Sequence, residues 1–293
     1  MRAKPIALAL CLGLSASGCI DTLTESTSIE LAVQGTRVDG AFEGRDGVPI
    51  SLERAHIVFG PVYLCAGFTA GNLCDESLAE WRGAVVVDAL SAEPTAVASM
   101  DALTGTARSY MYDFGIASRL TTPEMPLVTP AAESLGPASA VVSGRAEVEG
   151  QSIPFTVSVR VEQTGAVEQG VPVVRSGESD GIEQEILPDG QTRLRVRFDP
   201  RPWLATANFR ALVEDAACEA GRDVVCAGAV EQTCAPDGAL VASRECDANG
   251  QVCVRERGCV DRLELGAESQ LGRALRSGVE AGARPEFVFE VSP

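Results

Sequence analysis

Two residue types used in nucleophilic catalysis occur in this chain. His56 is its only histidine, and Ser179 lies in Gly177-Glu178-Ser179-Asp180-Gly181, which fits the G-x-S-x-G pattern of a nucleophilic serine. That pattern needs a strand before it and a helix after it, and the histidine must follow the serine along the chain. The segment Gly181 to Pro188 is a poor helix, and His56 lies far upstream. We interpret the serine segment as a polar loop and predict no catalytic residue there.

His56 has two further interpretations. It sits in the middle of a β-rich run, Pro49 to Cys65, which favours a structural or surface side chain. Alternatively, as the lone imidazole it would join methionine or cysteine sulfur in a copper site, because copper accepts such ligands. No paired Met or His motif supports a metal, so we predict no cofactor and keep His56 as the candidate metal ligand.

Three aromatic residues alternate in the run Thr106 to Ile116 and share one face of a strand. They are Tyr110, Tyr112 and Phe114. Alternation of this kind predicts that they pack in the core. The other interpretation is an exposed aromatic ridge that binds a ligand, for which Tyr110 and Tyr112 are the candidates.

The charge of the chain is strongly acidic, with 41 Asp and Glu against 24 Lys and Arg and a net charge of −17. Such a charge repels nucleic acid, whose binding proteins need basic patches. Lys4 is the only lysine, which excludes Schiff-base chemistry and a phosphate-loop lysine in a mature protein that lacks it. A hydrolase built on two carboxylates stays open as an alternative, since sequence alone cannot pair acidic residues. With 14 aromatic residues, few are available to stack on sugars.

The start of the chain has the pattern of an export signal. Arg2 and Lys4 precede an apolar stretch from Pro5 to Leu14, and small residues then lead to Cys19 in Leu14-Ser15-Ala16-Ser17-Gly18-Cys19. A cysteine at the cleavage point resembles the signal of bacterial lipoproteins over residues 1 to 20. The other interpretation is an ordinary secretory signal cut near Ala16 or Gly18, which leaves Cys19 as a thiol.

The resemblance implies that Cys19 becomes the first residue of the mature protein and carries the lipid. Three acyl chains, at about 0.8 kcal/mol per buried methylene, hold a protein at a membrane durably. The residue after the cysteine is Ile20 rather than Asp, which favours the outer over the inner membrane. Later apolar runs, such as Ile57 to Ala66, are shorter than the roughly 20 residues that a spanning helix needs.

Eight of the ten cysteines remain after Cys11 of the signal and Cys19 are set aside, and an even number fits disulfides in an oxidising compartment. Cys65 and Cys74 are expected to close a ten-residue loop, as a structural staple rather than a redox pair. Six more lie close together: Cys218, Cys226, Cys234, Cys246, Cys253 and Cys259. We expect all eight to form disulfides, and the six leave 15 pairings open.

The segment with six cysteines, about Glu214 to Asp261, contains no Phe, Tyr or Trp. It cannot bury a useful apolar core by itself, so crosslinks must stabilise it. Its cysteine spacing resembles EGF- or tenascin-like repeats, although six residues rather than one separate Cys246 from Cys253. Zinc is disfavoured because the segment has no Cys-x-x-Cys pair and no histidine.

The rest of the chain predicts an all-β fold, a β-sandwich with one or two short helices. Phe155, Val157, Val159 and Val161 alternate with polar residues, as do Leu194, Val196 and Phe198, and this period of two gives a strand one buried face. Further strands are expected at Ser28–Val33, Pro49–Cys65 with a bend at Gly60-Pro61, Ala84–Leu90, Thr106–Ile116, Ala140–Glu149 and Glu286–Val291, with a hairpin turn at Gly150-Gln151-Ser152 and a helix at Glu268–Gly278.

These patterns predict five segments: signal 1–18, acylated tether 19–27, sandwich 28–213, inserted cysteine-rich module 214–262, and a helix and strand returning to the sandwich at 263–293. We expect a lipid-anchored protein of the cell envelope that is not an enzyme and binds a protein or glycan partner, but not nucleic acid. The alternatives are a small-ligand or copper-binding lipoprotein and a carboxylate-based hydrolase.

Overall fold

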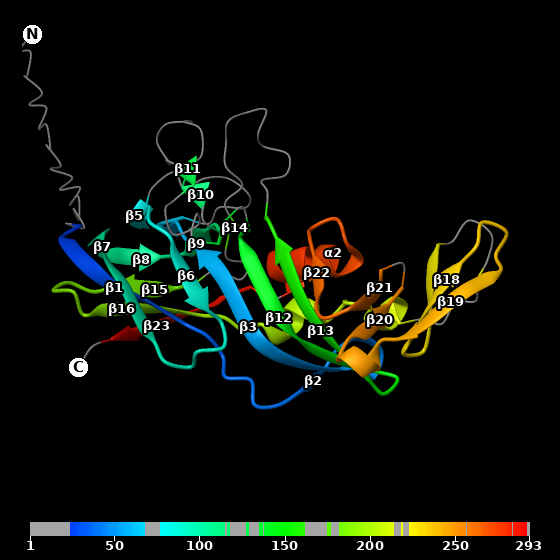
Figure 1. Cartoon of the computed structure of the whole chain (residues 1–293). Coiled ribbons are helices and arrows are strands. Elements are labelled where there is room, and N and C mark those ends of the chain that lie inside the picture. The colour runs from blue at the N-terminus through cyan, green and yellow to red at the C-terminus, as the bar shows by residue number, and fades with distance from the viewer. Residues whose placement is uncertain are drawn as a thin grey trace, which may run out of the picture.

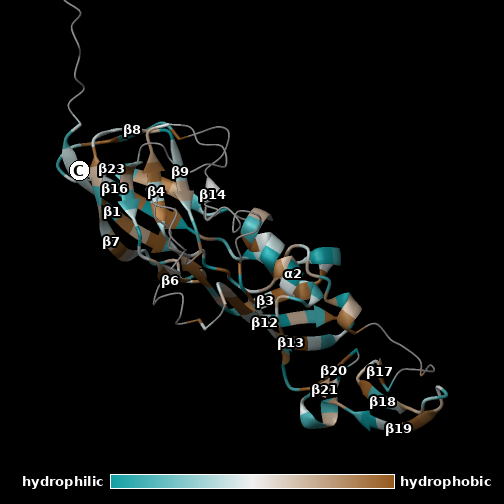
Figure 2. Ribbon diagram, turned by 90° about the horizontal axis from the view of Figure 1, so that it is seen from above, coloured by the Kyte–Doolittle hydropathy of each residue, from teal (hydrophilic) through white to brown (hydrophobic). Residues whose placement is uncertain are grey.

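The computed structural model describes residues 24–67, 77–114, 116–117, 127–128, 135–136, 138–161, 175–176, 182–213, 218, 223–255, 257–282 and 284–291. The described chain is all-β, as predicted, and is elongated (Figure 1). The beginning of the first strand and the C-terminal strand lie at one end of the molecule, and the cysteine-rich segment lies at the opposite end (Figures 1 and 2).

The larger of the two main sheets has eight strands among the described residues. Neighbouring strands are antiparallel except for the pair β1 and β16, which is parallel. In spatial order the strands are β14 (Arg175–Ser176), β9 (Ser109–Tyr112), β4 (Val62–Cys65), β5 (Ser77–Trp81), β7 (Thr95–Leu103), β1 (Ser26–Gln34), β16 (Thr192–Arg197) and β23 (Glu286–Val291).

The second main sheet has six described strands. They are β2 (Phe42–Glu43), β3 (Pro49–Phe59), β12 (Ala140–Val148), β13 (Gln151–Val159) and β22 (Leu263–Leu265), with β6 (Val85–Asp88) also paired to β3. Gly60 and Pro61 carry the chain from β3 in this sheet to β4 in the other, which confirms the predicted bend.

Short elements complete the described chain. Two further strand pairs are β8 (Gly105–Ala107) with β15 (Gln184–Ile186) and β10 (Ile116–Ala117) with β11 (Leu127–Val128). The helical segments are η1 (Arg45–Gly47), η3 (Arg201–Leu204), η4 (Arg210–Leu212), η5 (Asp247–Asn249), the α-helix α2 (Gln270–Ser277) and the π-turn η6 (Gly278–Gly282). The helix predicted at Glu268–Gly278 is present as α2, which begins later than predicted, at Gln270, because the Ser269 side chain accepts a hydrogen bond from the Gly272 amide and caps it.

Both main sheets contribute their inner faces to a single apolar core. The period of two predicted for β13 and β16 is confirmed: Phe155, Val157, Leu194 and Val196 are fully buried, while Thr156 and Arg195 between them are partly exposed. Trp203 in η3 is also buried in this core. The chain belongs to the sandwich on both sides of the cysteine-rich module: before it β16 pairs with β1, and after it β22 pairs with β13 and β23 pairs with β16.

Three predicted boundaries differ from the structure. Strand β1 begins at Ser26, inside the expected tether, because Ser26 pairs with Leu103 of β7. The β12–β13 turn consists of Glu149 and Gly150, both with positive φ, so the hairpin closes earlier than predicted. The run Thr106 to Ile116 divides near Arg108, because β8 pairs with β15 whereas β9 pairs with β4.

Aromatic rings bring the two ends of the eight-stranded sheet together. Tyr110 of β9 stacks on Phe287 of β23 with ring centroids 3.7 Å apart and an angle of 15° between the planes, although five strands lie between β9 and β23 in the sheet. Tyr112 and Phe59 also lie near Phe287, at 5.7 and 6.3 Å. The sheet therefore curls around its core, which a flat layer of an open sandwich would not do.

We predict that truncation at this contact destabilises the fold. Phe287→Ala should lower the free energy of unfolding by about 2 kcal/mol, less than for a fully buried ring, because Phe287 is half-buried. A double-mutant cycle with Tyr110→Ala, measured by denaturant unfolding, should give a coupling of about 0.5–1.5 kcal/mol. Val288→Ala, on the outer face of the same strand, is the control and should cost less than Phe287→Ala. Additive effects of the two aromatic substitutions would contradict a stabilising contact between β9 and β23.

Candidate functional site

The cysteine-rich module is held by three disulfides. Its strands are β17 (Val224–Ala227), β18 (Val230–Cys234), β19 (Leu240–Glu245), β20 (Val252–Val254) and β21 (Gly258–Val260). The pairs are Cys218–Cys234, Cys226–Cys253 and Cys246–Cys259, with Cα–Cα distances of 5.5, 5.8 and 5.2 Å. Disulfides among these six cysteines were predicted, and the structure selects one of the 15 pairings.

Two of these disulfides join the three-stranded sheet β17–β18–β19 to the hairpin β20–β21. Cys226 in β17 bonds to Cys253 in β20, and Cys246 just after β19 bonds to Cys259 in β21. Cys226, Cys246 and Cys253 have no exposed surface and pack together as a small cluster of their own. Sulfur thus takes the place of the aromatic side chains that the module lacks.

Glu231 adds a polar clamp to the same arrangement. Its Oε2 atom accepts hydrogen bonds from Arg244 Nη2 at 2.9 Å and from the Cys259 amide at 2.7 Å, so one carboxylate connects β18 with β19 and β21. Gly258 makes room for it: a Cβ there would come within 2.1 Å of Glu231 Oε2, and the φ of Gly258 is +71°. A larger residue at position 258 would displace this clamp.

The hairpin β20–β21 attaches the module to the sandwich. Val252 and Val254 are buried and belong to the main apolar core rather than to the disulfide cluster. The Arg255 amide donates to the Leu212 carbonyl at 2.8 Å, which ties the hairpin to the segment that precedes the module. The hairpin β20–β21 is therefore packed against the sandwich, and two disulfides in turn attach the sheet β17–β18–β19 to this hairpin.

Strand β19 is the exposed edge of the module. It pairs with β18 on one side and ends the order β17–β18–β19 among the described strands. All six of its residues are exposed, including the aliphatic pair Leu240 at 56% and Val241 at 66%. Val291, at 56%, is the other large apolar residue exposed to this degree in the described part of the chain, and it ends β23, a strand at the opposite end of the molecule (Figure 1).

His56 lies on β3 beside charged neighbours. Its Nδ1 atom accepts a hydrogen bond from Arg54 Nε at 3.1 Å, and its cross-strand partner on β6 is Asp88. Burial lowers the pKa of His56, the charge of Arg54 lowers it further, and the charge of Asp88 opposes both. No group of three or more His, Cys, Asp or Glu side chains in the described ranges could hold a metal ion.

The aromatic candidates contribute to the core. Tyr112 and Phe114 are almost fully buried, and Tyr110 is half-buried against Phe287. Their faces therefore contact other rings rather than forming an exposed ridge. Whether Tyr110 or Tyr112 contacts a ligand stays a prediction.

Several predicted residues lie outside the described residues: the signal with Cys19, the segment Gly177–Gly181 with Ser179, and Cys74. Cys65 is disulfide-bonded, as predicted, and its role as a structural staple stays a prediction. None of the helices within the described ranges has the length and hydropathy to cross a membrane.

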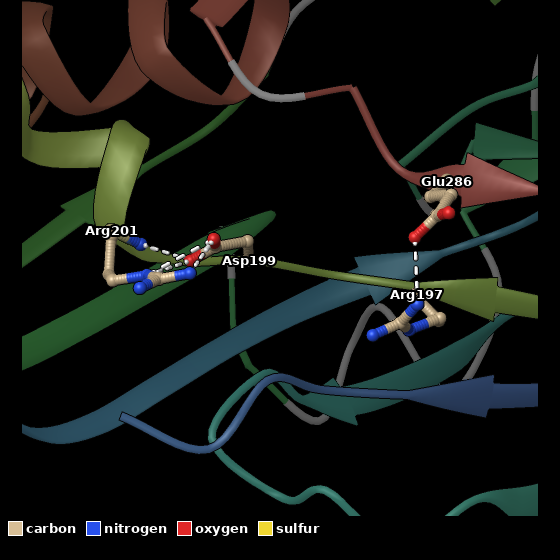
Figure 3. A network of polar contacts seen from close by, with 4 residues as sticks. All are labelled: Arg197, Asp199, Arg201 and Glu286. Atoms are coloured by element: carbon tan, nitrogen blue, oxygen red, sulfur yellow. Dashed lines mark hydrogen bonds and ion pairs between the residues drawn. The ribbon is translucent and has the colours of Figure 1, made fainter. Parts of the chain in front are cut away.

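Several acidic side chains of the described residues lie against arginines. Asp199 is bound by Arg201, with Nη2 to Oδ2 at 2.6 Å, and Glu286 by Arg197 at 3.0 Å (Figure 3). Burial raises the pKa of Asp199, but the hydrogen bonds and charge of Arg201 outweigh it and hold the pKa below its usual value. A hydrogen bond from Arg262 likewise lowers the pKa of Glu53. A glycosidase acid needs the opposite shift.

Comparison with known proteins adds little to this geometry. Neither protein-family models nor curated proteins give a match to the chain. Among solved structures, the chain is similar to MbnP from Methylosinus trichosporium, with 11% sequence identity, a TM-score of 0.31, and coverage of 67% of this chain and 86% of that chain. With so low an identity and so loose a superposition, the function must be argued from the residues of this chain.

We predict that His56 titrates below its ordinary value of about 6.5, because protonation works against burial and breaks the hydrogen bond to Arg54. In untagged protein its Cε1 proton gives a single NMR resonance whose midpoint reports this pKa. Arg54→Gln should raise the midpoint and Asp88→Asn should lower it. Since the folded-state pKa is depressed, the contribution of His56 to stability is present above pH 6.5 and is lost as pH falls below it. A midpoint at or above 6.5 would contradict the burial argument.

Proposed function

We propose that this chain is a lipid-anchored, non-enzymatic binding protein of the cell envelope. It presents the cysteine-rich module to a protein partner, and an extended segment of that partner adds to β19 as a further strand. The observation that carries the proposal is the exposed pair Leu240 and Val241 on an edge strand. Natural edge strands are commonly protected by charge, proline or cover, because unpaired backbone groups recruit other chains.

The chemistry of β19 favours an extended polypeptide as the partner. An edge strand offers main-chain donors and acceptors for affinity, and its side chains select the residues that lie beside them. Apolar Leu240 and Val241 occupy the first half of the strand, whereas Arg244 and Glu245 occupy the second. Glycans are less suited, since the segment Glu214 to Asp261 has no aromatic residue on which a sugar would stack.

The disulfides prepare the strand for binding. Cys226–Cys253, Cys246–Cys259 and the Glu231 clamp fix the module before a partner arrives, so that little order has to be gained on association. Binding sites ordered in advance lose less conformational entropy, which leaves more of the contact energy as affinity.

The position of the module supports the anchored arrangement. Strand β1 begins at Ser26, seven residues after Cys19, and its beginning lies at the end of the molecule opposite β19 (Figures 1 and 2). A lipid on Cys19 would therefore hold the sandwich near the membrane and leave the module at the far end. Ile20 favours the outer membrane as the place of attachment.

We predict that Leu240→Ser/Val241→Ser weakens partner binding about 30-fold, because two partly exposed aliphatic side chains contribute roughly 1 kcal/mol each when a partner covers them. The partner is first isolated from native envelopes with wild-type protein, and the dissociation constant is then measured by calorimetry. Val291→Ser, at the same exposure as Leu240 but at the other end, should change the constant less than twofold. Equal effects of both variants would refute binding at β19.

A separate prediction concerns the anchor. Mass spectrometry of the mature protein should show a polypeptide that begins at Cys19 and carries acyl chains, and Cys19→Ala should release the protein from membranes without detergent. A mature protein that begins elsewhere, or one with an unmodified Cys19 thiol, would contradict the lipid anchor while leaving the β19 proposal intact.

A further inference from the structure

A groove of about 600 Å³ lies on the outer face of the eight-stranded sheet, across β7, β1, β16 and β23. Its volume falls in the range of small-molecule sites. These strands lie at the end of the molecule away from the cysteine-rich module (Figures 1 and 2), so the groove is separate from β19. His56, Tyr110 and Tyr112 are not among the residues that line the groove.

Small side chains among large ones create this groove. In one cross-strand row of the outer face, Ala32 of β1 lies between Arg195 of β16 and Ala96 of β7. A β-bulge at this point leaves Val97 between the paired residues Ala96 and Ala98. The floor is therefore apolar and shallow, and the longer side chains beside it form the walls.

The neighbouring row supplies charge. Glu30 of β1 stands opposite Arg193 of β16, and Arg193 stands opposite Glu290 of β23. Arg193 Nε contacts Glu30 Oε2 at 2.7 Å, and Arg195 Nη2 contacts Glu290 Oε1 at 2.6 Å. Two arginines and two carboxylates make the groove locally neutral in a chain whose net charge is −17.

These contacts leave hydrogen-bond donors available on both arginines. A guanidinium has five N–H donors, and the contacts above occupy Nε of Arg193 and Nη2 of Arg195. The two side chains come from alternate residues of one strand and so lie on one face of the sheet. Their carboxylate partners hold them in place, which prepares a planar, charge-assisted contact with an anionic oxygen group.

We propose that this groove binds a small amphiphile with an apolar body and one anionic oxygen headgroup. The body lies on Ala32, Ala96 and Val97, and the headgroup accepts hydrogen bonds from Arg193 and Arg195. The site does not depend on the proposed function of β19, and either assignment stands without the other.

The test uses 1-anilinonaphthalene-8-sulfonate as an anionic fluorescent probe and N-phenyl-1-naphthylamine, its analogue without the sulfonate. All proteins carry Leu240→Ser/Val241→Ser, so that the exposed apolar pair of β19 does not contribute to the signal. The titration should show saturable binding of the anionic probe with one site per chain. Thermal unfolding of every variant confirms that it is folded before its binding is compared.

Three variants separate the parts of the site. Arg195→Gln should weaken the anionic probe at least tenfold and leave the uncharged analogue within twofold. Arg197→Gln, on the same face of β16 and also ion-paired but outside the groove lining, should leave both probes within twofold. Ala32→Leu should abolish binding of both probes, because it fills the floor.

The proposal is overturned if the anionic probe does not saturate at one per chain, if Arg195→Gln and Arg197→Gln have equal effects, or if Ala32→Leu has none. Equal weakening of both probes by Arg195→Gln would overturn the assignment of the arginines to an anionic headgroup.

Discussion

The stacking of Tyr110 on Phe287 is the contact on which the architecture depends. It joins β9 and β23, which lie far apart in the order of the eight-stranded sheet, and thereby fixes the curvature of that sheet around its core. Phe59 of the second sheet lies near the same ring, so both sheets meet there. Because β23 follows the cysteine-rich module in the chain and β9 precedes it, this contact joins segments from the two sides of the module.

The sandwich and the module are stabilised by different physical means. The sandwich buries alternating apolar residues from two sheets in one core, where stabilisation scales with the apolar area removed from water. The module buries little apolar area. Its disulfides stabilise it instead by lowering the conformational entropy of the unfolded chain. The hairpin β20–β21 belongs to both, since Val252 and Val254 pack in the main core while Cys253 and Cys259 hold the outer sheet.

Local pattern predicted some elements well and could not predict others. Strand β16 and the second half of β13 alternate, β23 follows a proline, and α2 begins at a serine cap, so their signals lie within a few residues. Strand β7 (Thr95–Leu103) was not predicted because it is rich in alanine, and its conformation depends on pairing with β1 and β5.

The candidate sites were harder to predict than the strands, because they are formed by residues that lie far apart in the sequence. Cysteine count and parity predicted disulfides, but the pairing follows from where β20 and β21 lie, which spacing does not encode. The exposure of Leu240 and Val241 follows from the edge position of β19 in its sheet. Likewise, the arginines of β16 were predicted to face outward, but their approach to Glu30 and Glu290 requires a register among three strands from opposite ends of the chain.

The position of β1 inside its sheet has a mechanical consequence. It is hydrogen-bonded along both edges, to β7 and to β16, rather than along one. Tension applied to the residues before Ser26 acts along the strand, so it loads two ladders in shear and must rupture many hydrogen bonds together instead of peeling them one by one. Strand β1 is thereby well arranged to bear a pulling force applied from its N-terminal side.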